Sequence, residues 1–244
     1  MIGKDTGKNV YTYEARVRYS ETDQYGKLTL GAILDYFQDT STFEAEDRGI
    51  GIAFLEENQI VWILSGWQVQ IESYPMLGEK IKINTFPYDF KNFFGMRNFY
   101  LQDERGRTLV RANTIWTLMD TEKGCPIRIP QNLLALYHLK DKIQMEYLPR
   151  KINLTDTMEE KEHVTIREYH LDTNGHVNNA QYVKIANEIS QTRNILGMRA
   201  DYRKAAKLGD VMIPYVGTES GKEIICFKDN DGTSYAVVEF QNEM

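Results

Sequence analysis

Residues 172–182 read DTNGHVNNAQY, a stretch that places carboxylate, amide and imidazole side chains immediately before an apolar pattern of helical spacing. Asn174-Gly175 is a turn signal, and Asn178 or Asn179 is a suitable helix N-cap. The apolar side chains that follow share the spacing of one buried helical face and are Ala180, Val183, Ala186 and Ile189. The sequence therefore predicts a polar turn at the N-terminus of a buried helix.

Two interpretations of this turn are open from the stretch alone. Unpaired backbone N–H groups and the positive end of the helix dipole favour developing negative charge, such as the oxyanion of an attacked carbonyl. Asx turns and N-caps, however, use the same residue types for structural reasons alone.

A second copy of the stretch lies 149 residues earlier (172 − 23 = 149), where residues 23–33 read DQYGKLTLGAI. Asp23 then falls on Asp172 and Gly26 on Gly175. The match continues on both sides through the pairs Val17 with Ile166, Arg18 with Arg167, Leu28 with Val177, Leu34 with Val183, Asp39 with Glu188 and Ser41 with Ser190. Residues 77–79 also resemble 208–210, and residues 103–106 resemble 229–232. The common order of these matches indicates a duplicated unit.

Each half is predicted to contain one long helix and a multistranded antiparallel sheet. In the first half the helix begins at Thr29 and reaches toward Gly49. The segments rich in strand-forming residues are 11–19, 61–71, 80–88, 95–102 and 108–120. The second half repeats this plan in fewer residues. The predicted domains are residues 1–130 and 163–244, and residues 131–162 are a predicted linker with a short helix at 133–136.

Composition narrows the class of protein. The chain has 244 residues, of which 42% are hydrophobic, as expected for a globular protein with a real core. Its net charge of −6 argues against a general nucleic-acid binder. No apolar run approaches the roughly 20 residues that cross a bilayer, and the N-terminus lacks a signal-peptide pattern. We therefore expect no membrane span and a cytoplasmic location. Cys125 and Cys226 form neither a metal spacing nor a disulfide framework.

With two helix-and-sheet halves in one chain, the sequence resembles the tandem hotdog fold of the acyl-acyl carrier protein (acyl-ACP) thioesterases. The pattern DxNxHxNNxxY at 172–182 matches that family's catalytic segment, and residues 19–31 and 47–51 resemble the first hotdog of its bacterial members. The resemblance covers nearly the whole chain. It implies an α+β fold of two tandem hotdog domains, each a long central helix wrapped by an antiparallel β-sheet.

The resemblance implies thioester hydrolysis without a metal or an organic cofactor. Asp172 is then the central carboxylate, which activates water or attacks the carbonyl itself. Asn174 positions water or substrate, and His176 orients the carboxylate or shuttles a proton. The candidate oxyanion donors are the backbone N–H groups of Val177, Asn178 and Asn179.

The two halves are not expected to share this chemistry. Tyr25 and Lys27 stand where the second half has Asn174 and His176. Only the second half is therefore predicted to be catalytic, and the first is predicted to shape the acyl pocket. Aromatic residues that provide a lining, or that serve as ordinary core, are Trp62, Trp67, Phe93, Phe94 and Trp116.

One segment departs from the family pattern. Plant members follow a segment like residues 201–204 with a Glu and a Cys, whereas this chain has Ala205 and Ala206. Because that Glu has been assigned a catalytic role, the base is open between Asp172 with His176 and a different carboxylate, and weak activity is a third outcome.

The implied partner is an acyl carrier protein bearing an acyl-phosphopantetheine thioester. Such carriers are acidic, so docking to an acidic chain requires a local basic patch. The candidates are Arg193, Arg199, Arg203, Lys204 and Lys207. Ordinary solvated charge is the alternative interpretation of this set. The sequence is also compatible with a homodimer.

The predicted function is an acyl-ACP thioesterase that releases free fatty acid and carrier protein in fatty acid biosynthesis. Two alternatives stay open: an acyl-CoA thioesterase, and a non-catalytic acyl-binding hotdog module. Single-hotdog acyl-CoA thioesterases carry similar motif residues, but the duplication and the N-terminal match favour the carrier-protein family.

Overall fold

The computed structural model describes residues 4–5 and 10–242, which form two compact units. The first comprises residues up to 64 together with 71–147, and the second comprises 65–70 together with the chain from 148 onward. Strand β3 (Ile60–Ile71) contributes residues to both units. The predicted linker, 131–162, is divided between them after Tyr147. No helix in the described ranges is long and apolar enough to span a membrane.

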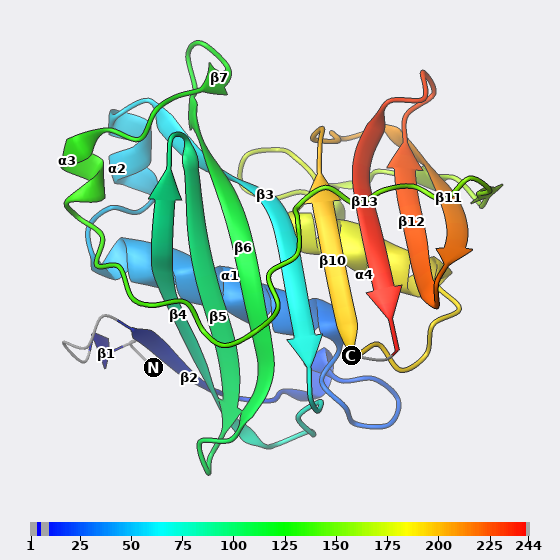
Figure 1. Ribbon diagram of the computed structural model, residues 1–244, viewed down its shortest axis with the longest axis horizontal. Helices are drawn as coiled ribbons and strands as arrows, with labels where there is room; N and C mark the ends of the chain where they lie inside the picture. Colours follow the sequence, from blue (N-terminus) through cyan, green and yellow to red (C-terminus); the bar gives the residue numbers. More distant parts are fainter. Residues whose placement is uncertain (1–3, 6–9, 243–244) are drawn as a thin grey trace. The chain divides into compact units, whose positions relative to one another are not determined.

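In the first unit, one long helix, α1 (Leu30–Asp47), lies along one face of an antiparallel sheet (Figure 1). The sheet follows the order β2-β4-β5-β6-β3. Its other strands are β2 (Tyr11–Arg16), β4 (Lys80–Lys91), β5 (Phe94–Asp103) and β6 (Thr108–Asp120). Shorter elements are β1 (Lys4–Asp5), β7 (Cys125–Pro126), a 3-10 turn (Tyr19–Glu21), α2 (Ile52–Glu57) and α3 (Gln131–Leu134).

Helix α1 forms where the apolar spacing predicted it. Thr29 is its N-cap, and the Thr29 hydroxyl accepts the N–H of Ala32 at 3.2 Å. Ile33 and Phe37, four residues apart, are fully buried against the sheet, where the Phe37 ring packs 5.2 Å from that of Phe99. The helix ends before Gly49, whose φ of +69° a residue with a Cβ rarely adopts.

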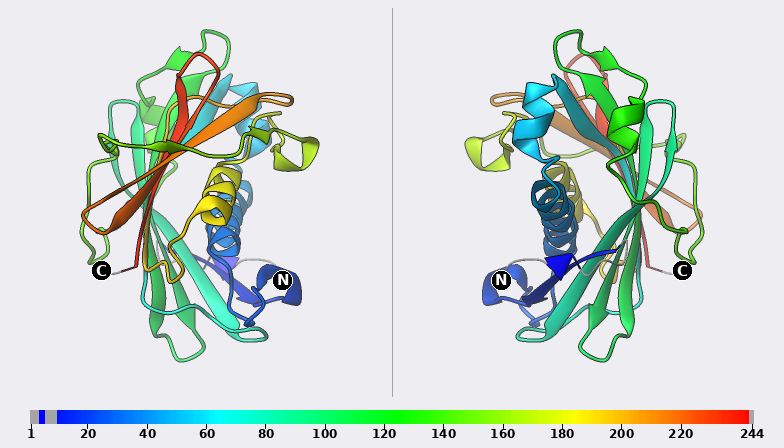
Figure 2. Two further views of the ribbon diagram at one scale, coloured as in Figure 1. Left: turned by 90° about the vertical axis from the view of Figure 1, so that its right-hand side faces the viewer. Right: turned by 90° about the vertical axis from the view of Figure 1, so that its left-hand side faces the viewer.

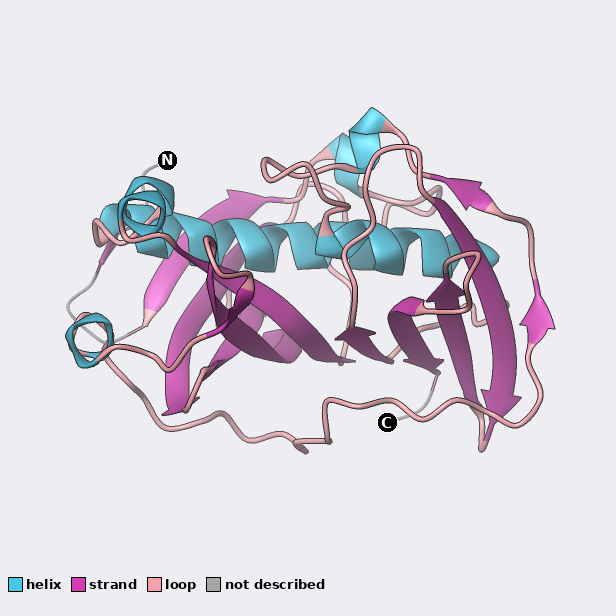
Figure 3. Ribbon diagram, turned by 90° about the horizontal axis from the view of Figure 1, so that it is seen from above, coloured by secondary structure: helices cyan, strands magenta, loops and turns pink. Residues whose placement is uncertain are grey.

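The second unit repeats the plan with a shorter helix, α4 (Asn179–Ile189). Its sheet follows the order β9-β11-β12-β13-β10, and residues 66–70 of β3 pair with β10. The strands are β9 (Val164–Thr165), β10 (Gly197–Tyr202), β11 (Val211–Glu219), β12 (Lys222–Lys228) and β13 (Ser234–Gln241). A second 3-10 turn (Glu168–His170) precedes the helix, and β8 (Glu159–Glu160) pairs with β11. Figure 3 shows a helix and a curved sheet in each unit.

The strand orders confirm the duplication. The sequence β2, α1, β3, β4, β5, β6 corresponds to β9, α4, β10, β11, β12, β13, and both sheets connect these strands in the same order. The matched glycines of the two polar turns, Gly26 and Gly175, have φ values of +75° and +70°. Because only glycine adopts this conformation readily, the turn itself has been retained in both halves.

Helix α4 stops where a buried carboxylate accepts its trailing backbone. Glu223, on β12, is 6% exposed and accepts the N–H groups of Gln191 at 3.1 Å and Thr192 at 3.2 Å. It also accepts the hydroxyls of Ser190 and Thr192. Those N–H groups are thereby turned away from the helical carbonyls that would otherwise extend α4.

Residues 138–152 run along the outer face of the strands, opposite the helices (Figures 1 and 2). In the first unit Asn98 holds this segment, since its side-chain oxygen accepts the N–H of Ile143 at 3.2 Å and the hydroxyl of Tyr147 at 2.9 Å. In the second unit Arg150 pairs with Asp201 at 2.7 Å, and Gln68 accepts the N–H of Leu148 at 3.0 Å. The predicted linker is thus fastened to strands over this stretch.

Candidate functional site

The stretch 172–178 folds into a closed turn built around one carboxylate. Oδ1 of Asp172 accepts the N–H of Asn174 at 2.8 Å and that of His176 at 3.2 Å, while the Asp172 N–H donates to the carbonyl of His176 at 2.8 Å. Gly175 provides the left-handed backbone at the tip. The turn therefore carries the three predicted catalytic residues, Asp172, Asn174 and His176, on one short segment.

The first unit contains the same turn without the same side chains. Oδ1 of Asp23 accepts the N–H groups of Tyr25 and Lys27, both at 2.9 Å, and the Asp23 N–H donates to the carbonyl of Lys27 at 2.8 Å. Because this half lacks the Asn and His, these bonds serve the turn itself. Oδ1 of Asp172 accordingly has a structural task, and Oδ2 makes no hydrogen bond within the described residues.

The two other motif side chains are available to solvent or substrate. Asn174 is exposed and His176 is half-buried, and neither side chain is hydrogen-bonded within the described part of the chain. The backbone of His176 forms an antiparallel bridge with Lys207. This bridge ties the turn to the segment that leads into β11, so the His176 ring projects from a fixed backbone.

The three backbone N–H groups predicted as oxyanion donors lie at the N-terminus of α4 and differ in their hydrogen bonding. Asn178, one of the two residues predicted as the N-cap, fills that position, and its side-chain oxygen accepts the N–H of Ala180 at 2.9 Å. The N–H of Val177, however, donates to Ala206 at 2.9 Å, and that of Asn178 donates to His170 at 2.9 Å. Among the three, the Asn179 N–H alone has no acceptor within the described ranges, whereas the N–H groups of Val177 and Asn178 are engaged by internal carbonyls.

The Ala205-Ala206 segment is bound to the motif through a tyrosine that sequence reasoning left out of the site. The fully buried Ala206 donates its N–H to the Tyr182 hydroxyl at 2.9 Å. Burial raises the pKa of Tyr182 to about 12, although the Ala206 hydrogen bond acts in the opposite direction. The position of Tyr182 in the motif, four residues after Asn178, is the sequence feature that points to it. An ordinary buried residue of the helix has the same spacing.

Asp210 is the carboxylate of this region that the sequence did not single out. Its Oδ2 accepts the N–H of Lys207 at 2.9 Å and the hydroxyl of Tyr235 at 3.2 Å. In the first unit Glu79 accepts the N–H of Met76 at 3.0 Å in the matching turn. Asp210 therefore closes a turn that both halves contain.

Models of one protein family match both halves of the chain. Residues 8–137 match the acyl-ACP thioesterase N-terminal domain, and residues 153–235 match the acyl-ACP thioesterase C-terminal domain. The chain belongs to the acyl-ACP thioesterase family. Within this family member the N-terminal match contains the Tyr25 turn and the C-terminal match contains the His176 turn.

Curated relatives of this family member are distant in sequence. A chloroplastic acyl-acyl carrier protein hydrolase of Cuphea viscosissima is 20% identical over 222 residues, which cover 80% of this chain and 52% of the relative. A chloroplastic palmitoyl-acyl carrier protein thioesterase of Arabidopsis thaliana is 23% identical over 215 residues, with the same two coverages. The chain spans about half the length of these relatives.

Solved structures match the fold over nearly the whole chain. An acyl-ACP thioesterase from Bacteroides thetaiotaomicron superposes with a TM-score of 0.88 at 22% identity, covering 96% of this chain and 98% of that one. A 12:0-ACP thioesterase from Umbellularia californica gives a TM-score of 0.83 at 20% identity, with coverages of 95% and 96%. The predicted α+β tandem hotdog fold is confirmed.

The predicted basic patch of this family member is mostly occupied by internal contacts. Arg199 binds Glu239 at 3.2 Å and donates to the carbonyl of Pro149 at 2.5 Å. Further internal contacts join Arg203 to Asp201 at 2.9 Å and to the Ile152 carbonyl at 3.2 Å, Lys204 to Asp229 at 2.7 Å, and Arg193 to the Ser190 carbonyl at 3.1 Å. Lys207 is exposed, and it is the one residue of the five whose side chain has no partner in the described part of the chain.

The aromatic residues considered for an acyl lining do not form one group. Trp62 packs against Phe90 and Tyr137 at centroid distances of 6.1 and 6.5 Å, within a hydrophobic cluster that includes Leu133 of α3. Trp67 lies in the part of β3 that belongs to the second unit. For Trp62 the ordinary core role is therefore the better description.

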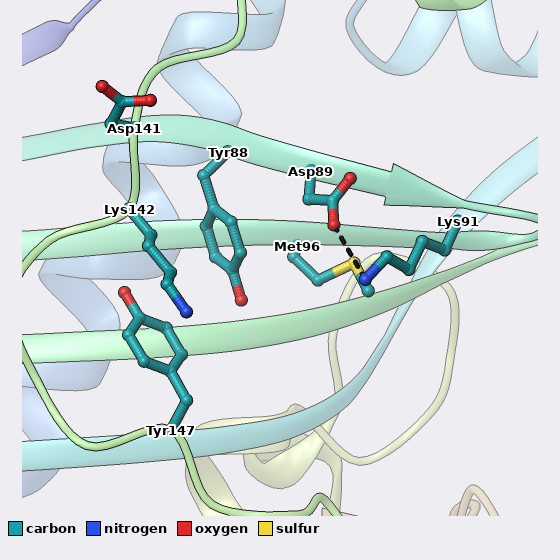
Figure 4. A pocket seen from close by; sticks show the side chains of 7 residues that line it. All are labelled: Tyr88, Asp89, Lys91, Met96, Asp141, Lys142 and Tyr147. Carbon is teal, nitrogen blue, oxygen red and sulfur yellow. Dashed lines mark ion pairs between the residues drawn. The ribbon is translucent and has the colours of Figure 1, made fainter.

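A hollow of about 380 Å³ lies on the outer face of the first unit (Figure 4). Strands β4 and β5 line one side and residues 141–147 the other. Three of its charged side chains have partners, since Lys91 binds Asp89 at 3.2 Å and the Lys142 ammonium lies 4.5 Å from the centre of the Tyr147 ring, while Asp141 also lines the hollow. The hollow lies on the sheet face opposite α1.

Proposed function

We propose that this protein hydrolyses the thioester of acyl-acyl carrier protein and releases a free fatty acid and the carrier. The proposal is supported by family membership over both halves and by the names of the curated relatives, which are acyl-acyl carrier protein hydrolases and thioesterases. The single observation that carries it is the turn of the second unit, which leaves Oδ2 of Asp172 and the His176 ring without hydrogen-bond partners among residues 4–5 and 10–242, at the N-terminus of α4.

In the proposed mechanism one oxygen of Asp172 holds the turn and the other performs chemistry. Oδ2 removes a proton from water as the water oxygen adds to the thioester carbonyl, or Oδ2 itself adds to the carbonyl and forms an acyl-aspartyl anhydride that water then hydrolyses to the free acid. In both routes the carbon–sulfur bond breaks, and the sulfur takes a proton and leaves as a thiol. His176 carries that proton to the departing sulfur, since imidazole nitrogens both accept and donate protons. Asn174 positions the water or the substrate through its amide.

The negative charge that develops on the carbonyl oxygen needs a stabilising donor. Among the three candidate N–H groups, that of Asn179 has no acceptor in the described part of the chain, and it lies in the first turn of α4. There the helix dipole adds a favourable potential for an anion. We therefore assign stabilisation of the oxyanion to the backbone N–H of Asn179.

The first unit is proposed to hold the acyl chain. Its turn has Tyr25 and Lys27 in place of Asn174 and His176, so it lacks the amide and the imidazole of the proposed mechanism. Its helix α1 is 18 residues long, and its buried side chains are largely apolar except for Thr40 and Glu44, whereas α4 has 11 residues. Bulky replacements of the buried apolar side chains of α1 should change the preferred acyl-chain length if they line the acyl-binding surface.

The decisive experiment measures free fatty acid released from acyl-carrier thioesters of several chain lengths and from matched acyl-CoA thioesters. We expect faster turnover of the carrier substrates. Asp172→Asn should lower turnover by about 100-fold, the usual scale for a positioned acid-base group, because the amide still closes the turn but does not accept a proton. Asp23→Asn is the matched control and should retain near wild-type turnover. Near wild-type turnover in Asp172→Asn would show that the mechanism is wrong.

Acyl binding without turnover is the second candidate function. Ala205 and Ala206 occupy the segment where plant members have a Glu and a Cys, and two of the three expected oxyanion donors are engaged elsewhere. Both observations favour a module that binds acyl thioesters and does not cleave them. Saturable binding of an acyl-carrier thioester with no release of fatty acid over the full substrate panel would select this candidate.

A further inference from the structure

His170 lies immediately before the His176 turn and contacts the backbone at both ends of it. The residue is 6% exposed. Its ring Nδ1 accepts the N–H of Arg167 at 3.0 Å, and its carbonyl accepts the N–H of Asn178, the N-cap of α4, at 2.9 Å. The ring therefore fastens the chain that enters the turn, and the carbonyl fastens the chain that leaves it.

In the first unit a carboxylate accepts the hydrogen bond that the His170 ring accepts in the second. Glu21 occupies the matching position (170 − 149 = 21); its Oε2 accepts the N–H of Arg18 at 2.8 Å and its carbonyl accepts that of Thr29, the N-cap of α1, at 2.9 Å. An ionised carboxylate accepts hydrogen bonds throughout the neutral range, whereas an imidazole nitrogen accepts only while it is unprotonated. The protonation-sensitive acceptor thus occurs in the half that carries the catalytic turn.

The surroundings of His170 favour the neutral ring. Burial is the main cause that lowers the pKa of His170 below its usual value of 6.5. Arg167 acts in the same direction, while Glu188, which faces the ring from α4, acts against it. The flanking carboxylates are those of Glu168 and Asp172, and Oδ1 of Asp172 is already engaged in the turn. Acceptance of the Arg167 N–H places the ring proton on Nε2.

We propose that His170 is a positioning residue that holds the catalytic turn while its ring is neutral and releases it on protonation. Once Nδ1 carries a proton, two donors face each other at the Arg167 backbone and that hydrogen bond is lost. The folded state resists this protonation, so the contribution to stability is complete above about pH 6.5 and is lost as the pH falls through the folded-state pKa. The link to activity rests on the proposed function.

The first test compares pH–rate profiles of the wild type and His170→Glu, which installs the acceptor that the first unit uses. Below the pKa of His170 the wild-type rate should fall about tenfold for each pH unit from this group alone. His170→Glu should retain at least about threefold more of its pH 7.5 rate than the wild type does at one pH unit below the folded-state pKa of His170. His163→Gln is the control, because this exposed histidine pairs with Glu160 away from the turn. It should keep the wild-type profile.

The second test does not depend on turnover. Amide hydrogen exchange at Arg167 should lose protection in the wild type as the pH falls through the folded-state pKa of His170, and Arg167 should stay protected in His170→Glu. If no thioester is hydrolysed, the proposed function fails while the exchange measurement still decides the role of His170. If His170→Glu does not fold, His170→Gln offers a neutral carbonyl acceptor for the same comparison. Superposable pH dependences of Arg167 exchange in the wild type and the folded variant would overturn the proposal.

Discussion

At the scale of single residues, one side chain of the motif has two roles that cannot be told apart from the sequence. Asp172 is both the predicted catalytic carboxylate and the residue that closes the turn, and its twin Asp23 performs only the second task. The turn and the N-cap were predictable because Asn-Gly and Asn-capped helices are local patterns. The engagement of the Val177 N–H was not, because its acceptor, Ala206, lies 29 residues further along the chain.

The twin turns allow the structural contribution of Asp172 to be measured apart from its chemistry. Asp172→Ala and Asp23→Ala each remove an acceptor of two backbone N–H groups, so each should lower the free energy of unfolding by about 1–3 kcal/mol. The corresponding Asn variants keep an acceptor oxygen and should cost less. Denaturant unfolding of the four variants makes the comparison. A much larger loss in Asp172→Ala than in Asp23→Ala would contradict equivalent roles in the two turns.

At the scale of elements, helices α1 and α4 differ in length, and one pair of corresponding strand residues contacts the helix in one unit and the residues after it in the other. Asp103 corresponds to Asp229 (229 − 103 = 126), so Arg97 corresponds to Glu223 (223 − 97 = 126). In the first unit Arg97 forms an ion pair with Glu44, and α1 continues to Asp47. In the second unit the position is acidic and accepts the N–H groups that follow α4. The helix starts were predictable from local caps, but this difference in their ends depends on a distant strand.

The Glu223 site should make the second unit sensitive to acid. Burial opposes ionisation most strongly, but the hydrogen bonds from Ser190, Gln191 and Thr192 together hold the pKa of Glu223 below its usual value of 4.5. A lowered carboxyl pKa contributes stability above the unfolded-state value, and that contribution is lost as the pH falls further. We expect Glu223→Gln to lower the free energy of unfolding by about 1–3 kcal/mol near pH 7 and by progressively less below pH 4.5.

Chemical denaturation at several pH values measures this difference. Glu219→Gln removes a carboxylate at the exposed end of β11 and serves as the control, with little effect expected at any pH. A Glu223→Gln deficit that did not shrink between pH 5 and pH 3 would contradict the assigned role of the ionised carboxylate.

At the scale of the whole molecule, the two-unit architecture was predictable from the repeat. The internal partners of the basic residues considered for carrier docking were not. The offset of 149 residues predicted one helix and one sheet in each half. Local sequence gave no sign that Arg199 and Arg203 bind the segment around residues 149–152. A basic side chain is read as surface charge unless its acidic or carbonyl partner, often dozens of residues away, is known.

Lys207 is the remaining candidate for steering an acidic carrier. Lys207→Glu should lower the apparent second-order rate on acyl-carrier substrate by about threefold or more at low salt, with less difference at high salt, because steering between exposed charges is screened. Hydrolysis of a small acyl thioester should change little. Lys151→Glu makes the same charge change at another exposed site and should have the smaller effect. Equal losses on the two substrates would show that Lys207 supports the turn and not docking.

The fastening of residues 138–152 has a consequence for resistance to proteases. A protease binds several consecutive residues in an extended, unpaired form, so exposed side chains alone do not make a cleavage site. Here the backbone is held by Asn98 and Gln68, and the segment must detach before it can enter a protease active site. Cleavage at the exposed Lys140 and Lys142 is therefore governed by the free energy of this local detachment. The connecting segment of the chain is protected by the sheets it joins.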